Sequence, residues 1–323
     1  MKTGEGPAVQ ARIAVVGSTN MDLVTRVDRL PLPGETVLGG DLLTLSGGKG
    51  ANQAVAAARL GGAVDFIGCF GGDAFGAQAA ARLTAEGINL QASVTDPETP
   101  HGVALILVEA SGQNSIAVAP GANRRLRPEH IRHTADTLSH CASMLCQLET
   151  PLDTVDEAIR LASQLGCQVI LNPAPAQAIP ESWFPHVDLL TPNEAESRAL
   201  LNLPDHVSFD PAAAAEEFLR RGAKGIVITL GGDGLYAAVE GVREHIPAFP
   251  VSAVDTTAAG DAFCGALAVA LGEGREIRPA LLWAAAAAAC SVTRMGAQDS
   301  LATREELDAF LAAHGVQCSE ELE

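Results

Sequence analysis

The chain has 323 residues, of which 47% are hydrophobic and 19% are charged, so it can bury a complete core in one large or two modest domains. Lysine and arginine number 21 against 39 acidic residues, and the resulting net charge of −18 disfavours nucleic acid as a partner. The seven cysteines form no CxxC pair and have no histidine at zinc-finger spacing, which indicates a reducing compartment, the cytoplasm. No run of about twenty apolar residues is present, so no membrane partner is expected.

The predicted elements begin with a buried strand at residues 11–18, a short apolar run that ends in Gly-Ser. Residues 23–48 and 101–120 carry short β-branched stretches broken by Pro-Gly, Gly-Gly and Ser-Gly turns, a pattern typical of antiparallel ribbons. We interpret two insertions, approximately residues 21–46 and 100–120, as a small β-sheet.

Apolar strands alternate with helical segments between residues 64 and 232. From residue 258 onward the pattern is almost entirely helical. Such alternation predicts an α/β fold in which helices cover a parallel sheet. Because the chain shows no internal repeat and no low-complexity linker, we expect one α/β domain spanning residues 1–323.

The segment DTTAAGDAFCGA, residues 255–266, carries the most specific chemical signal. Its small residues Ala258, Ala259 and Gly260 leave backbone amides uncovered where a helix begins, and the helix dipole adds about half a positive charge there. Asp261 lies in the first turn, where it could remove a proton from a hydroxyl held beside those amides. A helix cap with small neighbours for tight packing explains the same residues, so both interpretations stay open here.

A second glycine cluster, SGGKGANQAVAAARLG, starts at Ser46 and lacks the spacing of a Walker A phosphate loop. Gly48 would let a ligand approach the backbone, while Lys49 and Asn52 offer donors suited to sugar hydroxyls. Taken alone, the segment is explained better by a structural glycine turn before an alanine-rich helix.

Polar residues also follow the predicted strands. Asn20 and Asp22 come just after the first strand and could clamp neighbouring hydroxyls, although Asx-turns are the commoner role of such pairs. Glu149 follows the strand at residues 143–148. Asn193 and Glu196 follow the strand VDLL.

A glycine-rich turn, formed by Gly231, Gly232, Asp233 and Gly234, follows Thr229. It could pass close to a nucleotide or simply form a tight hairpin. Because the carboxyl ends of parallel strands meet at one edge of a sheet, we expect this turn and the polar residues after the other strands to share a crevice.

Together, GGKGANQAVAAARLG and DTTAAGDAFCGAL resemble the two signatures of the phosphofructokinase-B family of carbohydrate kinases. The resemblance covers nearly the whole chain and extends to PGETV, QLETP, LNPAPA, TPNEAE and VTRMGAQ. It implies a three-layer sandwich built on a parallel sheet, with a small β-sheet lid. It also implies that the protein transfers the γ-phosphoryl group of ATP to O5 of D-ribose, and that two lids clasp into a homodimer.

The resemblance further implies roles for individual residues. Those implied to hold the sugar are Asn20, Asp22, Gly48, Lys49, Asn52 and Glu149. Asp261 would be the catalytic base, and Ala258, Ala259 and Gly260 would form the anion hole. Those implied to bind ATP are Asn193, Thr229, Gly231, Gly232, Asp233, Gly234 and Gly260, with Glu196 acting on Mg²⁺ through water. A potassium ion would be held, partly through backbone carbonyls, by Asp255, Thr257, Ser291, Arg294, Gly296 and Ser300.

Three residues depart from the family pattern. Ala285 stands where a His or Asn often contacts adenine, and Ala262 and Cys264 replace a Thr and an Asn after the base. We expect activity to survive, because Ala262 and Cys264 lie on the helix and not on the amides or the base. Phosphorylation of deoxyribose, fructose or a nucleoside remains an alternative, as does a sugar-binding regulatory pseudokinase. Retention of Asp261 and Glu196 argues against the pseudokinase.

Overall fold

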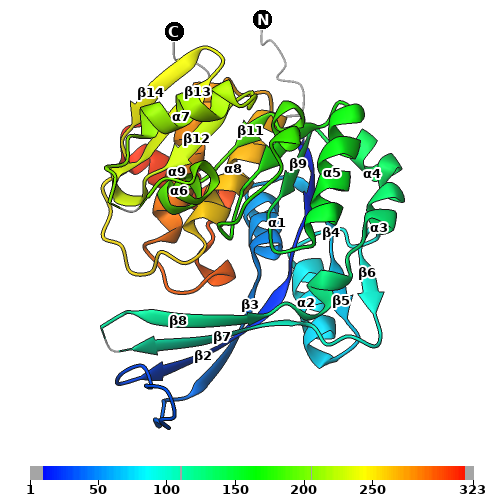
Figure 1. Ribbon diagram of the computed structural model, residues 1–323, viewed down its shortest axis with the longest axis vertical. Coiled ribbons are helices and arrows are strands. Elements are labelled where there is room, and N and C mark those ends of the chain that lie inside the picture. Colours follow the sequence, from blue (N-terminus) through cyan, green and yellow to red (C-terminus); the bar gives the residue numbers. More distant parts are fainter. Residues whose placement is uncertain (1–9, 110, 205, 317–323) are drawn as a thin grey trace, which may run out of the picture.

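The computed structural model describes residues 10–316 apart from residues 110 and 205 (Figure 1). Its main sheet has eight strands among the described residues, in the spatial order β14, β13, β12, β11, β10, β9, β1, β4. Their bounds are β1 (Arg12–Val16), β4 (Ala63–Ile67), β9 (Ser143–Cys146), β10 (Gln168–Leu171), β11 (Leu189–Leu190), β12 (Ile226–Thr229), β13 (Leu235–Val239) and β14 (Val242–Ile246). All pairings from β12 to β4 are parallel, and β13 and β14 add an antiparallel edge.

Helices cover both faces of this sheet (Figure 1). One face packs against α1 (Lys49–Arg59), α2 (Ala74–Ala85), α8 (Ala259–Gly272), α9 (Ile277–Ser291) and α10 (Arg304–Ala313). The other packs against α3 (Pro128–Arg132), α4 (Ala135–Ser139), α5 (Leu152–Gln164), α6 (Glu194–Leu201) and α7 (Pro211–Arg220). The predicted α/β fold, with its three layers, is thereby confirmed.

Strand β1 shows why the sheet lies in the middle. Ile13 and Val15 point into the core beneath α1 and α8, whereas Ala14 and Val16 belong to the core beneath α5. All four residues are completely buried. Alternate side chains of a strand point to opposite faces, so a continuous apolar run is what a strand covered on both sides requires.

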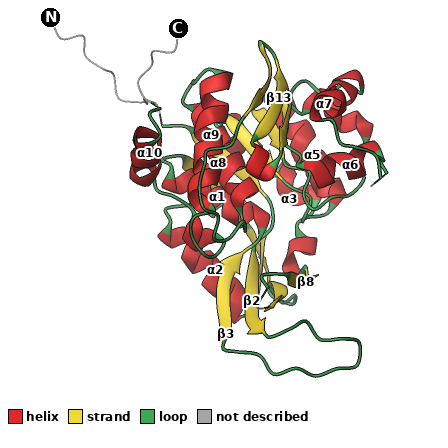
Figure 2. Ribbon diagram, turned by 90° about the vertical axis from the view of Figure 1, so that its left-hand side faces the viewer, coloured by secondary structure: helices red, strands yellow, loops and turns green. Residues whose placement is uncertain are grey.

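A separate four-stranded sheet projects from the body (Figure 2). It consists of β3 (Leu42–Gly47), β2 (Asn20–Val27), β7 (Gly102–Glu109) and β8 (Asn114–Ala119), in that order. The two antiparallel ribbons expected from the sequence are β2–β3 and β7–β8, and a parallel pairing of β2 with β7 joins them. A two-stranded sheet of β5 (Cys69–Gly71) and β6 (Val94–Asp96) lies at its base.

Short 3₁₀ turns complete the described chain: η1 (Gly121–Arg125), η2 (Glu181–His186), η3 (Gly231–Asp233) and η4 (Gln298–Ser300). Six cysteines of the described part of the chain, at 69, 141, 146, 167, 264 and 290, are free and buried. Among the described residues, no helix has the length and apolar character needed to span a bilayer.

Candidate active site

Helix α8 begins with backbone amides that precede its first helical hydrogen bond. Its N-cap residue, Ala258, has a φ of 60°, a left-handed conformation that L side chains adopt only at some cost. The first helical hydrogen bond runs from Ala262 N to Ala258 O (2.8 Å), so the N–H groups of Gly260 and Asp261 precede the bonded part of the helix. A Cβ placed on Gly260 would meet no atom within 4 Å outside its chain neighbours and the adjoining backbone of α8. This end of α8 therefore has the form of an anion site.

The carboxylate of Asp261 is fixed beside these amides. Asn52 Nδ2 donates to its Oδ2 (2.9 Å), and Gln53 Nε2 donates to its Oδ1 (3.1 Å). Burial raises the pKa of Asp261, while the charge of Lys49 and the two amide donors act in the opposite direction. A buried, oriented carboxylate whose pKa lies above the ordinary value suits a general base.

Close contact between α1 and α8 creates this arrangement. A Cβ on Gly265 of α8 would lie 2.6 Å from the Cβ of Ala56 and 2.8 Å from the carbonyl oxygen of Gln53, both on α1. The two helices therefore approach more closely than any larger residue at position 265 would allow. At this separation the amides of Asn52 and Gln53 reach Asp261.

Gln53 belongs to a buried polar chain that the sequence interpretation missed. Gln147 Nε2 donates to Gln53 Oε1 (2.6 Å), and Gln53 Nε2 also lies 3.2 Å from Asn172 Oδ1. Asn172 Nδ2 in turn donates to the carbonyl of Thr191 (3.0 Å). Helical spacing could have identified Gln53 from the sequence, because Lys49, Asn52 and Gln53 share one face of an otherwise alanine-rich helix.

The residues expected to hold the sugar meet where β1 and β9 end. Glu149 follows β9, and its Oε2 accepts hydrogen bonds from Ser18 Oγ, which follows β1, and from Lys49 N (3.0 Å). Burial, together with the charge of Glu149, raises the pKa of Asp22 to about 7. Asn52 Oδ1 is buried and has no hydrogen-bond partner among the described residues, so it could accept a ligand hydroxyl.

Asn20 and Gly48 complete that end of the site. Asn20 is buried, and its Oδ1 accepts from Asn123 Nδ2 (2.7 Å), a partner that the sequence interpretation did not identify. Gly48 has a φ of 90°, and a Cβ there would lie 2.8 Å from Asn20 N. Glycine is therefore required at this position for both conformation and space.

A cavity of about 180 Å³ lies at the carboxyl edge of the sheet. The predicted residues that line it are Lys49, Asn193, Glu196, Thr229, Ala258, Ala259, Gly260 and Asp261. Burial lowers the pKa of Lys49, but the charges of Asp261, Glu149 and Glu196 outweigh that effect and raise it above the ordinary value. Cys264 also lines the cavity and lies 3.3 Å from Thr191 Oγ1, so this departure from the family pattern does reach the site.

Asn193 and Glu196 form one unit at the start of α6. Asn193 N donates to Glu196 Oε2, and Glu196 N donates to Asn193 Oδ1, each over 2.8 Å, which is a capping box. Burial raises the pKa of Glu196. Asn193 also bridges to Thr229 at the end of β12. The glycine-rich residues 231–234 lie beyond Thr229 and close the β12–β13 hairpin through a bond from Leu230 N to Gly234 O (2.7 Å).

The two segments expected to hold a monovalent cation lie side by side. Asp255 Oδ1 accepts from Thr257 N (2.9 Å), and its Oδ2 accepts from Gly296 N (2.9 Å). Burial raises the pKa of Asp255, but these hydrogen bonds outweigh it and hold the pKa below its usual range. The three remaining expected residues have local partners: Ser291 Oγ and Ser300 Oγ donate to carbonyls of their own segments, and Arg294 pairs with Glu306.

Comparison with known proteins places this site in a family. The sequence pattern described as "pfkB family carbohydrate kinase" matches residues 10–304, nearly the whole chain. The chain belongs to the pfkB family of carbohydrate kinases. Both glycine clusters lie within the matched region of this kinase.

Relatives of this pfkB kinase include ribokinase from Haemophilus influenzae, 40% identical over 93% of this chain and 98% of the relative. Deoxyribokinase from Salmonella typhi is 38% identical over 93% of this chain and 98% of the relative. Two solved structures superpose with a TM-score of 0.87 over 94% of this chain and 99% of theirs. One is ribokinase from Thermotoga maritima, at 42% identity, and the other is ribokinase from Arabidopsis thaliana complexed with ribose and ATP, at 32%.

Proposed function

We propose that this chain phosphorylates D-ribose at O5, using ATP as the phosphoryl donor. The observation that carries the proposal is the placement of Asp261, a buried carboxylate held by Asn52 and Gln53, beside the uncovered amides of α8 in one cavity. Similarity to ribokinases, including the one complexed with ribose and ATP, supports the choice of substrates.

Each part of the site has a distinct task in this reaction. Asn20, Asp22, Asn52 and Glu149 would hold the sugar hydroxyls, with Asn52 Oδ1 accepting one of them. Asp261 would take the proton of the attacking hydroxyl, while the N–H groups of Gly260 and Asp261 stabilise the negative charge of the transferred group. The transition state of phosphoryl transfer is loosely bonded, so it gains most from positioning and charge neutralisation. Rigid helix ends supply both.

The nucleotide and the metal ions would lie on the side of Asp261 that faces away from the sugar. Asn193, Thr229 and the turn at residues 231–234 would hold ATP, and Glu196 would orient the water shell of Mg²⁺. The proposed potassium ion would lie beside Asp255 and Gly296, where a carboxylate and backbone carbonyls offer the oxygen ligands that such ions prefer. These ions would supply positive charge against the phosphates, which matters in a chain of net charge −18.

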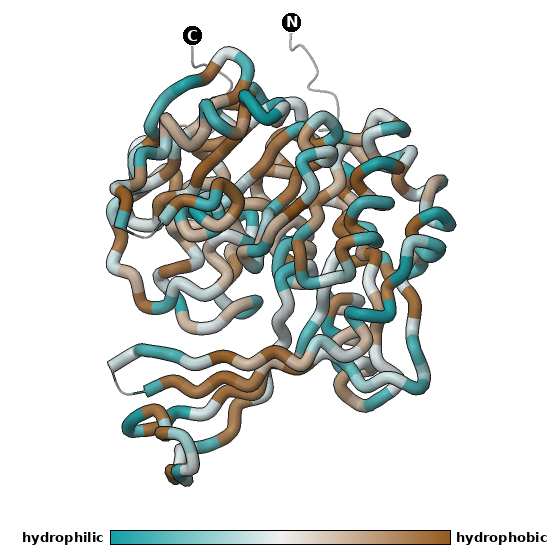
Figure 3. The backbone as a smooth tube through the Cα atoms, viewed as in Figure 1, coloured by the Kyte–Doolittle hydropathy of each residue, from teal (hydrophilic) through white to brown (hydrophobic). Residues whose placement is uncertain are grey.

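We further propose that the four-stranded sheet is a lid and that two lids associate in a homodimer. Long parts of its strands are hydrophobic (Figure 3), yet several of their large side chains are exposed. These are Leu42, Leu43, Leu105, Ile116 and Val118, each at least 49% exposed. By the strand register, Leu43, Ile116 and Val118 share one face of the sheet and Leu42 and Leu105 share the other. Exposed apolar side chains gathered on a face usually mark an interaction surface. The reaction would take place in the cytoplasm, in keeping with the six free cysteines of the described chain.

Deoxyribose is the second candidate substrate, because a deoxyribokinase is nearly as similar to this chain as the ribokinases are. The test is ADP release with Mg·ATP over ribose, 2-deoxyribose, fructose and nucleosides, with and without potassium. The highest kcat/KM for ribose would support the proposal. A higher kcat/KM for 2-deoxyribose would instead identify deoxyribose as the substrate. No turnover on any acceptor would refute the kinase activity and favour a regulatory sugar-binding role.

A further inference from the structure

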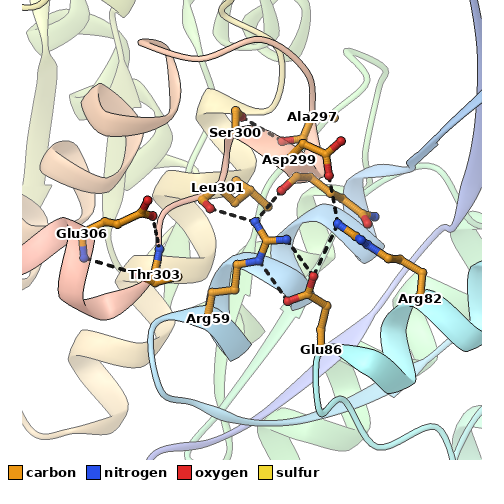
Figure 4. A network of polar contacts seen from close by, with 10 residues as sticks. Arg59, Arg82, Glu86, Ala297, Asp299, Ser300, Leu301, Thr303 and Glu306 are labelled. Atoms are coloured by element: carbon orange, nitrogen blue, oxygen red, sulfur yellow. Dashed lines mark hydrogen bonds and ion pairs between the residues drawn. The ribbon is translucent and has the colours of Figure 1, made fainter. Parts of the chain in front are cut away.

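Arg59 forms a partly buried bidentate ion pair outside the active-site cavity (Figure 4). It is the last residue of α1, and its Nε and Nη2 donate to the two carboxylate oxygens of Glu86 over 2.9 and 2.7 Å. The side chains are only 17% and 16% exposed, and these bonds hold the pKa of Glu86 below its usual range. Two parallel hydrogen bonds fix a guanidinium in both position and orientation.

The third nitrogen of this guanidinium holds another part of the chain. Arg59 Nη1 donates to the carbonyl oxygens of Gln298 (2.7 Å) and Leu301 (2.8 Å), as Figure 4 shows for Leu301. Both carbonyls belong to residues 296–301, which we name the cation loop because it contains Gly296 and Ser300. One nitrogen therefore fixes two carbonyls that bracket the last part of this loop.

Two weaker anchors act on the same loop. Arg82 Nη2 donates to Asp299 Oδ1 (2.9 Å), but Asp299 is 65% exposed, so solvent screens this pair. Thr303 and Glu306 form a capping box that starts α10 directly after the loop (Figure 4). Asp255 also bonds to the loop backbone, at Gly296 N (2.9 Å), whereas Arg59 bonds to the carbonyls of two buried residues, Gln298 and Leu301.

We infer that Arg59, fixed by Glu86, is a positioning residue that holds the cation loop in the geometry needed to bind a monovalent cation. This inference rests on the proposed potassium site. Backbone carbonyls bind a weakly held ion well only when they are already in place, because ordering the loop upon binding would cost affinity. Arg59 also connects this loop to the sugar end of the site, since α1 begins at Lys49 and carries Asn52.

The test compares Arg59→Met with the wild-type enzyme in potassium titrations of ADP release. The methionine keeps most of the unbranched side chain but removes all three sets of hydrogen bonds. We expect the half-activating potassium concentration to rise at least about fivefold, the low end of measured coupling between sites. Turnover at saturating potassium should stay within about twofold, because no atom of Arg59 belongs to the active-site cavity.

Arg59→Lys should give a smaller rise, since it keeps the charge without the bidentate geometry. Arg12→Gln is the matched control: it breaks the ion pair with buried Asp65 (2.8 Å) on a different part of the fold and should leave the potassium titration unchanged. A readout independent of turnover is the rise in melting temperature with KCl relative to NaCl, which should shrink in Arg59→Met.

Two outcomes are decisive. A wild-type enzyme without monovalent-cation activation would remove the potassium site itself. Activation in the wild type with an unchanged half-activating concentration in Arg59→Met would refute the positioning role and leave the potassium site intact. If Arg59→Met does not fold, the same criteria apply to Arg59→Lys and to Glu86→Gln, which leaves the guanidinium in place but loosens it.

Discussion

Gly260 offers a perturbation in which stability and activity should change in opposite directions. In Gly260→Ala, the new methyl group meets no atom within 4 Å outside its chain neighbours and the adjoining backbone of α8, and Gly260 lines the cavity. Because Gly260 is helical, the alanine lowers the entropy of the unfolded chain and should stabilise the protein by about 0.4–1 kcal/mol. For a chain of this size the melting temperature should rise by about 1–3 °C.

The same methyl group would take up space in the cavity that Gly260 and Asp261 both line, where their N–H groups would meet the transferred phosphoryl group. Losing one such donor to the transferred phosphoryl group typically costs about 10²- to 10³-fold in kcat. The assays are calorimetric melting and steady-state ADP release on the same preparation. Gly40→Ala is the control, because its nearest neighbour would be Arg26 O at 3.8 Å and it lies outside the cavity. Wild-type kcat in Gly260→Ala would refute the anion site.

Three further predictions concern separate parts of the site and the lid. Asp261→Asn should lower kcat about 10²- to 10⁴-fold, the usual contribution of a positioned base, and near-wild-type turnover would remove Asp261 from that role. Folding raises the pKa of Asp22 from 3.8 to about 7, so the folded state retains a proton that the unfolded state releases. The contribution of Asp22 to the free energy of unfolding should therefore fall as pH rises from about 4 to about 7. Urea titrations of Asp22→Asn should show a flatter pH dependence, and an unchanged curve would contradict the pKa shift. Leu105→Arg, on the lid, should shift the protein toward monomers in sedimentation velocity, whereas Val207→Arg, at a 41% exposed site elsewhere, should not.

The local elements of this fold follow from local sequence patterns. The apolar run before Gly17 became β1, and the small residues before Asp261 became the start of α8, because burial and helix capping depend on near neighbours. The hydrogen bond between Ser18 and Glu149 could also be expected, because the parallel strands before these residues end at the same edge of the sheet.

Contacts between distant segments were not predictable in the same way. Strands β2 and β7 pair in parallel, but nothing in residues 20–27 specifies a partner some eighty residues further along. The bond from Gln53 to Asp261 depends on how closely two helices cross, and the bonds from Arg59 depend on a loop more than 200 residues away. Such pairings arise from the packing of the whole core, which periodicity does not encode.

The close crossing of α1 and α8 at Gly265 has an evolutionary consequence. Because the space at Gly265 is limited by Ala56, a larger residue at either position would push apart the base and the two amides that hold it. Positions 56 and 265 should therefore change together or not at all in related sequences. The two signature segments, about 200 residues apart, would then be inherited as a matched pair, and a chimera that exchanged only one of them between relatives should lose activity despite folding.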